Sequence, residues 1–202
     1  MSDHPMIDEV LEFWFGEPDE HGICVSEKSK AWWRKDPDFD REIRDRFGAL
    51  RDRIMDGQHE DWRDSPRGLL AYVVVLDQFS RNLGRDTPAM FEADTQAVEA
   101  ALAGIEAGLD GQLPTDLRGF LYMPLMHCEQ LEQQERCIAL FEASLERAAA
   151  PARERVAANV KFAKAHRDIV ARFGRFPHRN AALGRDSTPE EAEFLEQPGS
   201  SF

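Results

Sequence analysis

The chain has 202 residues and a formal net charge of −13 at pH 7, with 42% hydrophobic and 31% charged residues. This composition suits one globular domain with its own core, which we expect to cover residues 1–202. An acidic chain repels nucleic acid and anionic membranes at long range, and no apolar run approaches the ~18 residues of a membrane span. We therefore expect neither nucleic acid nor a membrane as a partner.

The three cysteines show no CxxC spacing, which argues against a disulfide scaffold and a zinc ribbon. The stretch MSDHPMIDEV has neither the basic start nor the apolar run of a secretory signal. No glycine-rich phosphate loop and no GxSxG elbow occurs, so no cofactor is expected. These features together predict a cytoplasmic protein.

Apolar residues recur three and four positions apart along most of the chain, as in amphipathic helices. The first stripe lies in residues 7–14, and the second begins at the Asp36–Pro37 cap and runs to Gly57. Later helix starts are predicted at Ser65-Pro66, Thr87-Pro88, Thr115-Asp116, Pro124, Pro151 and Thr188. No stretch shows sustained period-2 alternation, so we predict an all-α fold of about eight helices.

Polar residues that interrupt apolar stripes are the candidates for a site. In the helix expected at residues 151–173, His166 shares a stripe with Phe162, Ile169 and Phe173. A buried histidine must be hydrogen-bonded, so His166 is either a satisfied core residue or part of a site.

Asp77 belongs to LDQFSRN and is expected in or near the last turn of a helix that ends around Phe79. A carboxylate there opposes the helix dipole and needs a cation, which Arg81 at i+4 can supply. Asp77 therefore either forms a simple ion pair or orients an arginine or histidine within a site.

His127 is expected about one turn beyond Pro124, near a helix start. Residues two apart point to nearly opposite sides of a helix, so His127 and Glu129 cannot easily share a metal, nor can His166 and Asp168. No dense ligand motif is present, and we expect no metal site.

The stretch RFGRFPHRN, residues 172–180, concentrates positive charge. It lies within residues 151–185, where nine Lys/Arg and two Asp/Glu give a net +7. Gly174 is placed to cap a helix, and Arg172 and Arg175 match the negative end of its dipole. This leaves His178, Arg179 and Asn180 without an explanation. The basic segment either pairs with acidic neighbours or faces an anion.

Five strings together resemble a bacterial family known as domain of unknown function 924: VLEFWFG, WWRKDPDFD, LDQFSRN, FLYMPLMHCE and HRDIVARFGRFPHRNAALGRDST. The resemblance spans about Val10 to Leu195. It implies a right-handed α-α superhelix similar to tetratricopeptide-repeat proteins, and it brings no known reaction.

Two positions depart from the family pattern, which usually has proline at Ser80 and serine at Cys128, so neither residue is a good candidate nucleophile. The family pattern matches the polar residues Asp77, Arg81, Asn82, His127, Glu129, His166, Arg172, Arg175, His178, Arg179 and Asn180. We take Asp77, His127 and His166 as candidate catalytic residues and the others as candidate ligand-binding residues.

Three functions are compatible with these residues. The leading hypothesis is a pocket whose arginines bind a small anionic ligand. The second is a hydrolase in which His127 or His166 acts as general base at the same pocket. The third is a peptide- or protein-binding scaffold with aromatic anchors at Trp32, Trp33 and Trp62.

Overall fold

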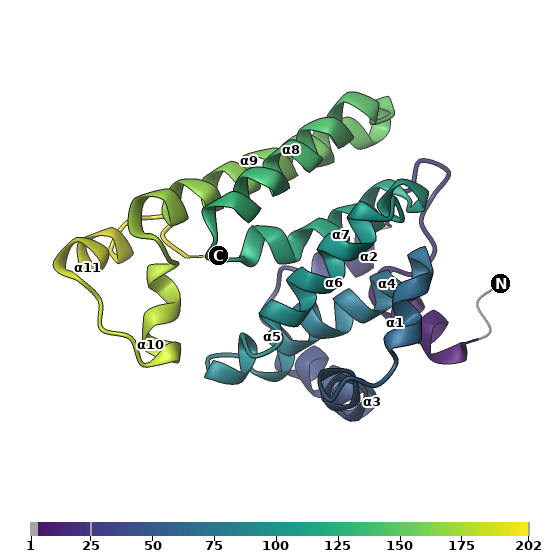
Figure 1. Ribbon diagram of the computed structural model, residues 1–202, viewed down its shortest axis with the longest axis horizontal. Coiled ribbons are helices and arrows are strands. Elements are labelled where there is room, and N and C mark those ends of the chain that lie inside the picture. The colour runs from purple at the N-terminus through teal and green to yellow at the C-terminus, as the bar shows by residue number, and fades with distance from the viewer. Residues whose placement is uncertain (1–3, 25, 202) are drawn as a thin grey trace.

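The computed structural model describes residues 4–24 and 26–201 (Figure 1). Within these ranges the chain is all-α, as predicted, and its only strand-like pairing is an isolated antiparallel bridge between Pro18 and Cys24. None of the described helices is both long and apolar enough to span a membrane.

The α-helices, in chain order, are α1 (Pro5–Phe15), α2 (Ser26–Ala31), α3 (Pro37–Met55), α4 (Pro66–Val73), α5 (Ser80–Leu83), α6 (Asp94–Glu106), α7 (Thr115–His127), α8 (Leu131–Arg147), α9 (Ala150–Phe173), α10 (Asn180–Leu183) and α11 (Pro189–Leu195). Four 3-10 turns and one π-helical turn lie between the described α-helices. The 3-10 turns are η1 (Glu60–Asp64), η3 (Pro88–Met90), η4 (Asp110–Gln112) and η5 (Pro177–Arg179), and the π-helical turn is η2 (Val74–Phe79). There are thus more helical segments than the eight expected, because several are single turns.

Capping residues set the helix ends that the sequence predicts. The Asp36 carboxylate accepts hydrogen bonds from the first turn of α3, and the Ser65 hydroxyl does the same for α4. Thr188 and Glu191 form a reciprocal capping box on α11. Gly174 ends α9 with φ 70°, in the left-handed region that favours glycine.

Three predicted boundaries are wrong. Pro124 lies inside α7, and the helix expected to start there begins at Leu131. Thr87-Pro88 opens only the single turn η3, and α6 begins at Asp94. The helix that carries Asp77 does not end at Phe79, because the π-helical turn η2 joins α4 to α5 without a break.

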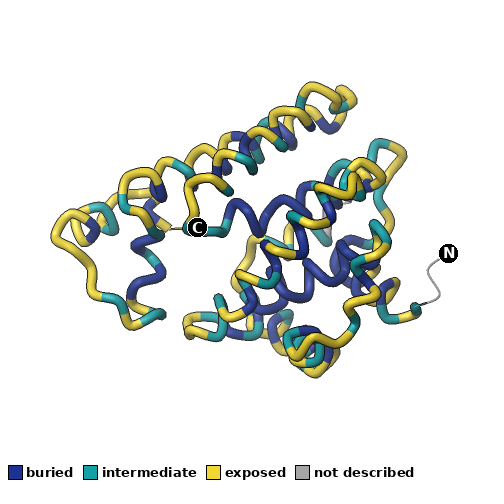
Figure 2. Tube along the Cα trace, viewed as in Figure 1, coloured by how far each residue is buried: buried dark blue, intermediate teal, exposed yellow. Residues whose placement is uncertain are grey.

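The main core gathers around α4 and η2, whose residues from Gly68 to Phe79 are all buried (Figure 2). Helices α8 and α9 run side by side in opposite directions and both pack against α7, and α9 ends near the C-terminal turns (Figure 1). A second, small apolar cluster of Ile169, Val170 and Phe176 lies there. The right-handed, tetratricopeptide-like order of the helices and the assignment of residues 1–202 to one domain stay predictions.

Candidate functional site

Asp77 is the most deeply buried ion in the candidate site, with 1% of its side chain exposed. It projects from η2, the π-helical turn. Its Oδ1 accepts a hydrogen bond from Arg81 Nη2 at 2.9 Å and lies 2.7 Å from His127 Nδ1. Its Oδ2 accepts a bond from Gln78 Nε2 at 2.6 Å. Both oxygens are therefore satisfied, which buried carboxylates require.

His127 is the last residue of α7, so its expected position near a helix start is wrong. The C-terminal end of this helix delivers the ring to Asp77, which holds Nδ1 and leaves Nε2 turned away from the carboxylate. The His127 side chain is 19% exposed. This is the geometry of a histidine whose tautomer and orientation are fixed by a buried acid.

Arg179 enters the same place from η5, beyond the end of α9. Its guanidinium lies 4.6 Å from the ring centres of both Phe91 and Phe176. Its Nη2 donates to the His127 carbonyl at 2.7 Å, and its side chain is 7% exposed. Two aromatic faces and this bond hold the cation rigidly beside His127.

Asp94 completes the arrangement and was missed by the sequence reasoning. One of its oxygens accepts a bond from Arg81 Nη2 at 2.8 Å and the other from Arg179 Nη1 at 3.0 Å. An acidic residue at the first position of a helix is ordinarily explained by the dipole, so nothing in the sequence marked it. We call Asp77, Arg81, Asp94, His127 and Arg179 the polar cluster.

His166 and His178 border the polar cluster. His166 is buried, its ring centre is 6.3 Å from that of His127, and its Nδ1 lies 2.8 Å from the Phe162 carbonyl oxygen. The His178 ring packs 5.5 Å from that of Phe176. The predicted stripe was only partly right, since Phe162 is 55% exposed while His166 points inward.

Burial and neighbouring charges fix the protonation of the cluster. Burial opposes ionisation of Asp77, but His127 and Arg81 outweigh it and hold the pKa of Asp77 below its ordinary value. Burial, reinforced by Arg81, lowers the pKa of His127 even though Asp77 opposes this. Because His127 is then neutral at pH 7, Arg81 supplies the lasting positive charge beside Asp77, and His127 donates Nδ1–H to the carboxylate.

Burial also shifts the pKa values of the other ionisable groups in and around the cluster. Burial raises the pKa of Asp94 and lowers that of Arg179 to about 10. Burial, with His127 nearby, lowers the pKa of His166 to about 3, and burial with Arg179 lowers that of His178 to about 4. At pH 7 the histidines are neutral, and two arginines balance two carboxylates.

Three other predicted ligand-binding residues lie apart from the cluster and bind the C-terminal helix α11. Arg175 makes a bidentate pair with Glu191 at 2.6 and 2.8 Å, and Arg172 pairs with Glu190 at 2.8 Å. Asn180 Nδ2 donates to Glu191 Oε2 at 3.3 Å. We call these five residues the C-terminal clasp.

The last two predicted residues also have partners elsewhere. Asn82 donates to Asp40, which also accepts a bidentate pair from Arg85. Glu129 accepts two bonds from Arg185 and one from the Phe176 backbone N–H. Glu129 therefore fixes the loop that carries Arg179, rather than facing His127.

The structure also places the aromatic anchors of the scaffold hypothesis. Trp62 is buried, and Trp32 packs its ring 4.6 Å from that of Phe120, whereas Trp33 is 69% exposed. Within the described ranges, no group of three or more His, Cys, Asp or Glu side chains is arranged to hold a metal ion.

The fold and cluster together define the class: an all-α protein in which two arginines, two carboxylates and a neutral histidine meet between distant segments. The chain belongs to the family described as bacterial proteins of unknown function, DUF924, whose model matches residues 10–199. This confirms the resemblance seen in the motifs.

The chain is also similar to a solved structure of a protein of unknown function from Agrobacterium tumefaciens. The two share 32% sequence identity over 96% of this chain and 98% of the other, with a TM-score of 0.79. A comparison with curated proteins gives no match.

Proposed function

We propose that this protein binds a small ligand bearing an anionic group at the exposed edge of the polar cluster. The observation that carries the proposal is that Arg81 and Arg179, from distant parts of the chain, reach the same carboxylate, Asp94. A carboxylate therefore matches the space between these guanidiniums. Asp94 is 18% exposed, so an incoming oxyanion can share or replace its contacts.

Two further features support a binding role. The Nε atoms of Arg81 and Arg179 are buried and have no acceptor among the described residues, which costs about 1–3 kcal/mol for each unsatisfied group. Asp77 also lies in a π-helical turn, a rare conformation that recurs at functional sites. A purely structural ion-pair network requires neither feature.

Charge balance makes proton uptake part of the proposal. An added anion leaves the balanced cluster with a net negative charge in a poorly hydrated site. His127 Nε2 or the Asp94 carboxylate then takes up a proton, while Arg81, Arg179 and Asp77 keep their charges and His166 and His178 stay neutral. Affinity is therefore expected to increase as pH falls.

A second candidate function, a hydrolase, rests on the 2.7 Å contact between Asp77 and His127. His127 Nε2 would take a proton from a water molecule as its oxygen attacks the substrate, and Asp77 would stabilise the resulting imidazolium. Arg81 and Arg179 would bind the negative charge that develops on the substrate. No nucleophilic side chain is required by this route.

A thermal-shift screen with small carboxylates and phosphates tests the binding proposal. We expect at least one anion to stabilise the wild type and the Arg175→Lys variant, whose change lies in the C-terminal clasp. The same anion should have little effect on Arg179→Lys. If no anion shifts the wild type, or if both variants lose the response equally, the proposal is wrong.

An activity screen against ester, amide and phosphoester substrates tests the hydrolase candidate. His127→Gln should abolish any turnover that the wild type shows, while His21→Gln, a change at a surface histidine, should leave it intact. Turnover that is equal in the wild type and in the double variant His127→Ala, His166→Ala would eliminate this candidate and leave the binding proposal standing.

A further inference from the structure

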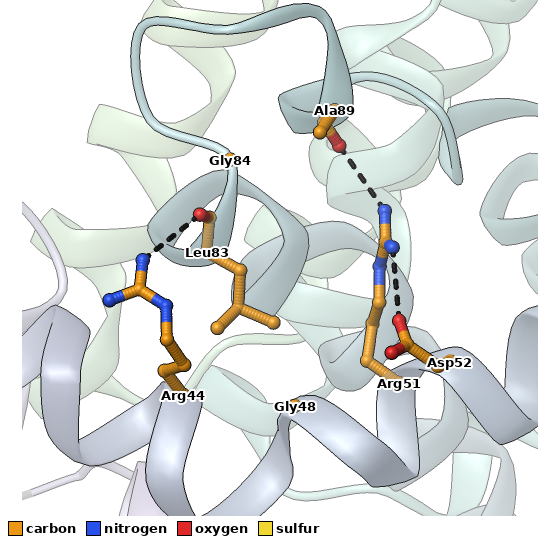
Figure 3. Close-up of a pocket in the computed structure, with 7 residues that line it drawn as sticks. All are labelled: Arg44, Gly48, Arg51, Asp52, Leu83, Gly84 and Ala89. Carbon is orange, nitrogen blue, oxygen red and sulfur yellow. Dashed lines mark hydrogen bonds and ion pairs between the residues drawn. The ribbon is translucent and has the colours of Figure 1, made fainter.

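A separate hollow of about 210 Å³ lies between α3 and the segment that joins α5 to η3 (Figure 3). It is lined by Arg44, Gly48, Arg51, Asp52, Leu83, Gly84 and Ala89. None of these residues belongs to the polar cluster or to the C-terminal clasp. The hollow is therefore independent of the function proposed above.

Two arginines stand on either side of the hollow, with Gly48 between them on the same helix (Figure 3). Arg44, Gly48 and Arg51 occupy positions i, i+4 and i+7 of α3, so they share one face. Along the helix axis, seven residues separate the arginines by roughly 10 Å. Their side chains lean over the hollow toward the carbonyls of Leu83 and Ala89.

The two guanidiniums differ in how firmly their neighbours hold them in place. Arg44 forms no ion pair with a described carboxylate, and its bond to the Leu83 carbonyl is long, at 3.3 Å. Arg51 is held in place, because its Nε donates to the buried Ser80 hydroxyl at 3.2 Å and its side chain is 12% exposed. One cation is thus free to adjust and the other is preorganised.

Gly48 is unexpected in the middle of a 19-residue helix, where glycine costs about 1 kcal/mol relative to alanine. Close packing does not explain it, since an added Cβ would meet only Arg44 Cγ, at 3.9 Å. The missing side chain instead keeps the floor of the hollow open between the arginines.

Two exposed carboxylates pair with Arg51 beside the hollow. Asp52 and Glu92 approach Arg51 at 3.3 and 3.4 Å, but they are 71% and 52% exposed and so bind it weakly. The lining side chains carry two positive charges and one negative charge, and Glu92 adds a second negative charge beside Arg51. Leu83 and Ala89 add an apolar wall.

We infer that this hollow is a second binding site, for a small organic oxyanion whose carboxylate or phosphate group lies between Arg44 and Arg51. A short apolar portion of the same molecule packs against Leu83 and Ala89. Carboxylate and phosphate share the charge and the acceptor geometry that arginine recognises. The free volume limits the ligand to a few carbon atoms beyond the charged group.

Residue-specific amide NMR signals can show whether an anion binds in this hollow or elsewhere on the protein. Inorganic phosphate and butyrate are titrated separately into the labelled full-length chain, and the Gly48 and Gly84 signals are followed. We expect saturable shifts at both glycines, with butyrate also shifting Leu83 and Ala89. A response to phosphate alone would restrict the site to phosphate compounds, and a response to butyrate alone would restrict it to carboxylates.

Matched variants complete the test. Arg44→Met should weaken binding at least tenfold, and Gly48→Met, which fills the hollow with a good helix former, should abolish it. Arg41→Met removes an exposed arginine of the same helix that pairs with Asp38 outside the hollow, so it should bind normally. The inference is overturned if the shifts do not saturate, if Arg41→Met loses them equally, or if they appear only around His127.

Discussion

The arginines of RFGRFPHRN belong to two different structures. Arg172 and Arg175 bind carboxylates 18 and 16 residues away on α11, and their side chains are 48% and 28% exposed. Arg179, four residues further on, is 7% exposed and binds Asp94, 85 residues away in the sequence, and the His127 carbonyl. Charge density in the sequence therefore does not locate the site, whereas burial and distant partners do.

The contrast implies different consequences of losing a charge. In the exposed Arg172–Glu190 pair of the clasp, water can solvate whichever partner is left behind, whereas the buried Glu191 relies on its bonds to Thr188 and Asn180. In the polar cluster, water cannot solvate the remaining ions. Removal of one ion therefore leaves the others buried without their partner.

The largest effect is expected for Asp77→Ala. It leaves His127 Nδ1 without its acceptor and Arg81 with only Asp94, so the free energy of unfolding should fall by about 3–5 kcal/mol. Urea unfolding followed by circular dichroism measures this. Glu190→Ala in the clasp, whose side chain is 63% exposed, should cost less than about 1 kcal/mol. Equal losses would remove the distinction between the two regions.

Acid should weaken the fold through His166 and His178. Because burial holds their pKa values at about 3 and 4, they stay neutral in the folded chain while the unfolded chain binds protons below about pH 6.5. Each histidine should therefore cost roughly 1.4 kcal/mol per pH unit between pH 6 and pH 4.

Urea midpoints at pH 6, 5 and 4 measure this slope. His166→Gln should reduce it. A slope that His166→Gln does not alter would show that His166 is protonated in the fold.

Arg175→Met should loosen α11 without unfolding the chain. Glu191 keeps its bonds to the Thr188 backbone and Asn180, so the helix stays capped but loses its bidentate partner. Hydrogen exchange should accelerate in residues 189–195 and stay unchanged in α7. Faster exchange throughout α7 would instead couple the clasp to the polar cluster.

The smallest effect is expected for Arg172→Ala, whose ion pair with Glu190 is exposed on both sides. Its contribution to the free energy of unfolding should be at most about 0.5 kcal/mol, and it should fall further in high salt. A thermal-melt comparison at low and high salt measures it. A loss as large as that of Asp77→Ala would contradict the view that the clasp pair is solvated.

The sequence predicts much of the fold because local signals set it. Asp36, Ser65 and Thr188 cap helices where expected, and Gly174 ends α9. Pro124 misled the prediction, since proline favours a helix start but here is tolerated within α7. The π-helical turn around Asp77 has no sequence signature. The predicted helix end at Phe79 is therefore too early, because the helical segment continues through α5.

The site is only partly predictable for a different reason. Asp77 and Arg81 are i, i+4 neighbours, and that local pair was predicted and is observed. The contacts of Arg179 with Asp94 and His127 join distant segments, and no spacing rule reports them. Helical periodicity correctly predicted that His166 points inward. It gave no information on the partner of Arg175, which binds Glu191 of α11 and lies apart from His127.

The account depends most on a neutral His127 whose Nδ1–H is held by Asp77 and whose Nε2 is an acceptor. Long-range proton–nitrogen NMR spectra of the histidine rings at pH 7 measure this directly. We expect a neutral ring in the Nδ1–H tautomer when no ligand is bound. A doubly protonated His127 ring at pH 7 without ligand, or an Nε2–H tautomer, would contradict it.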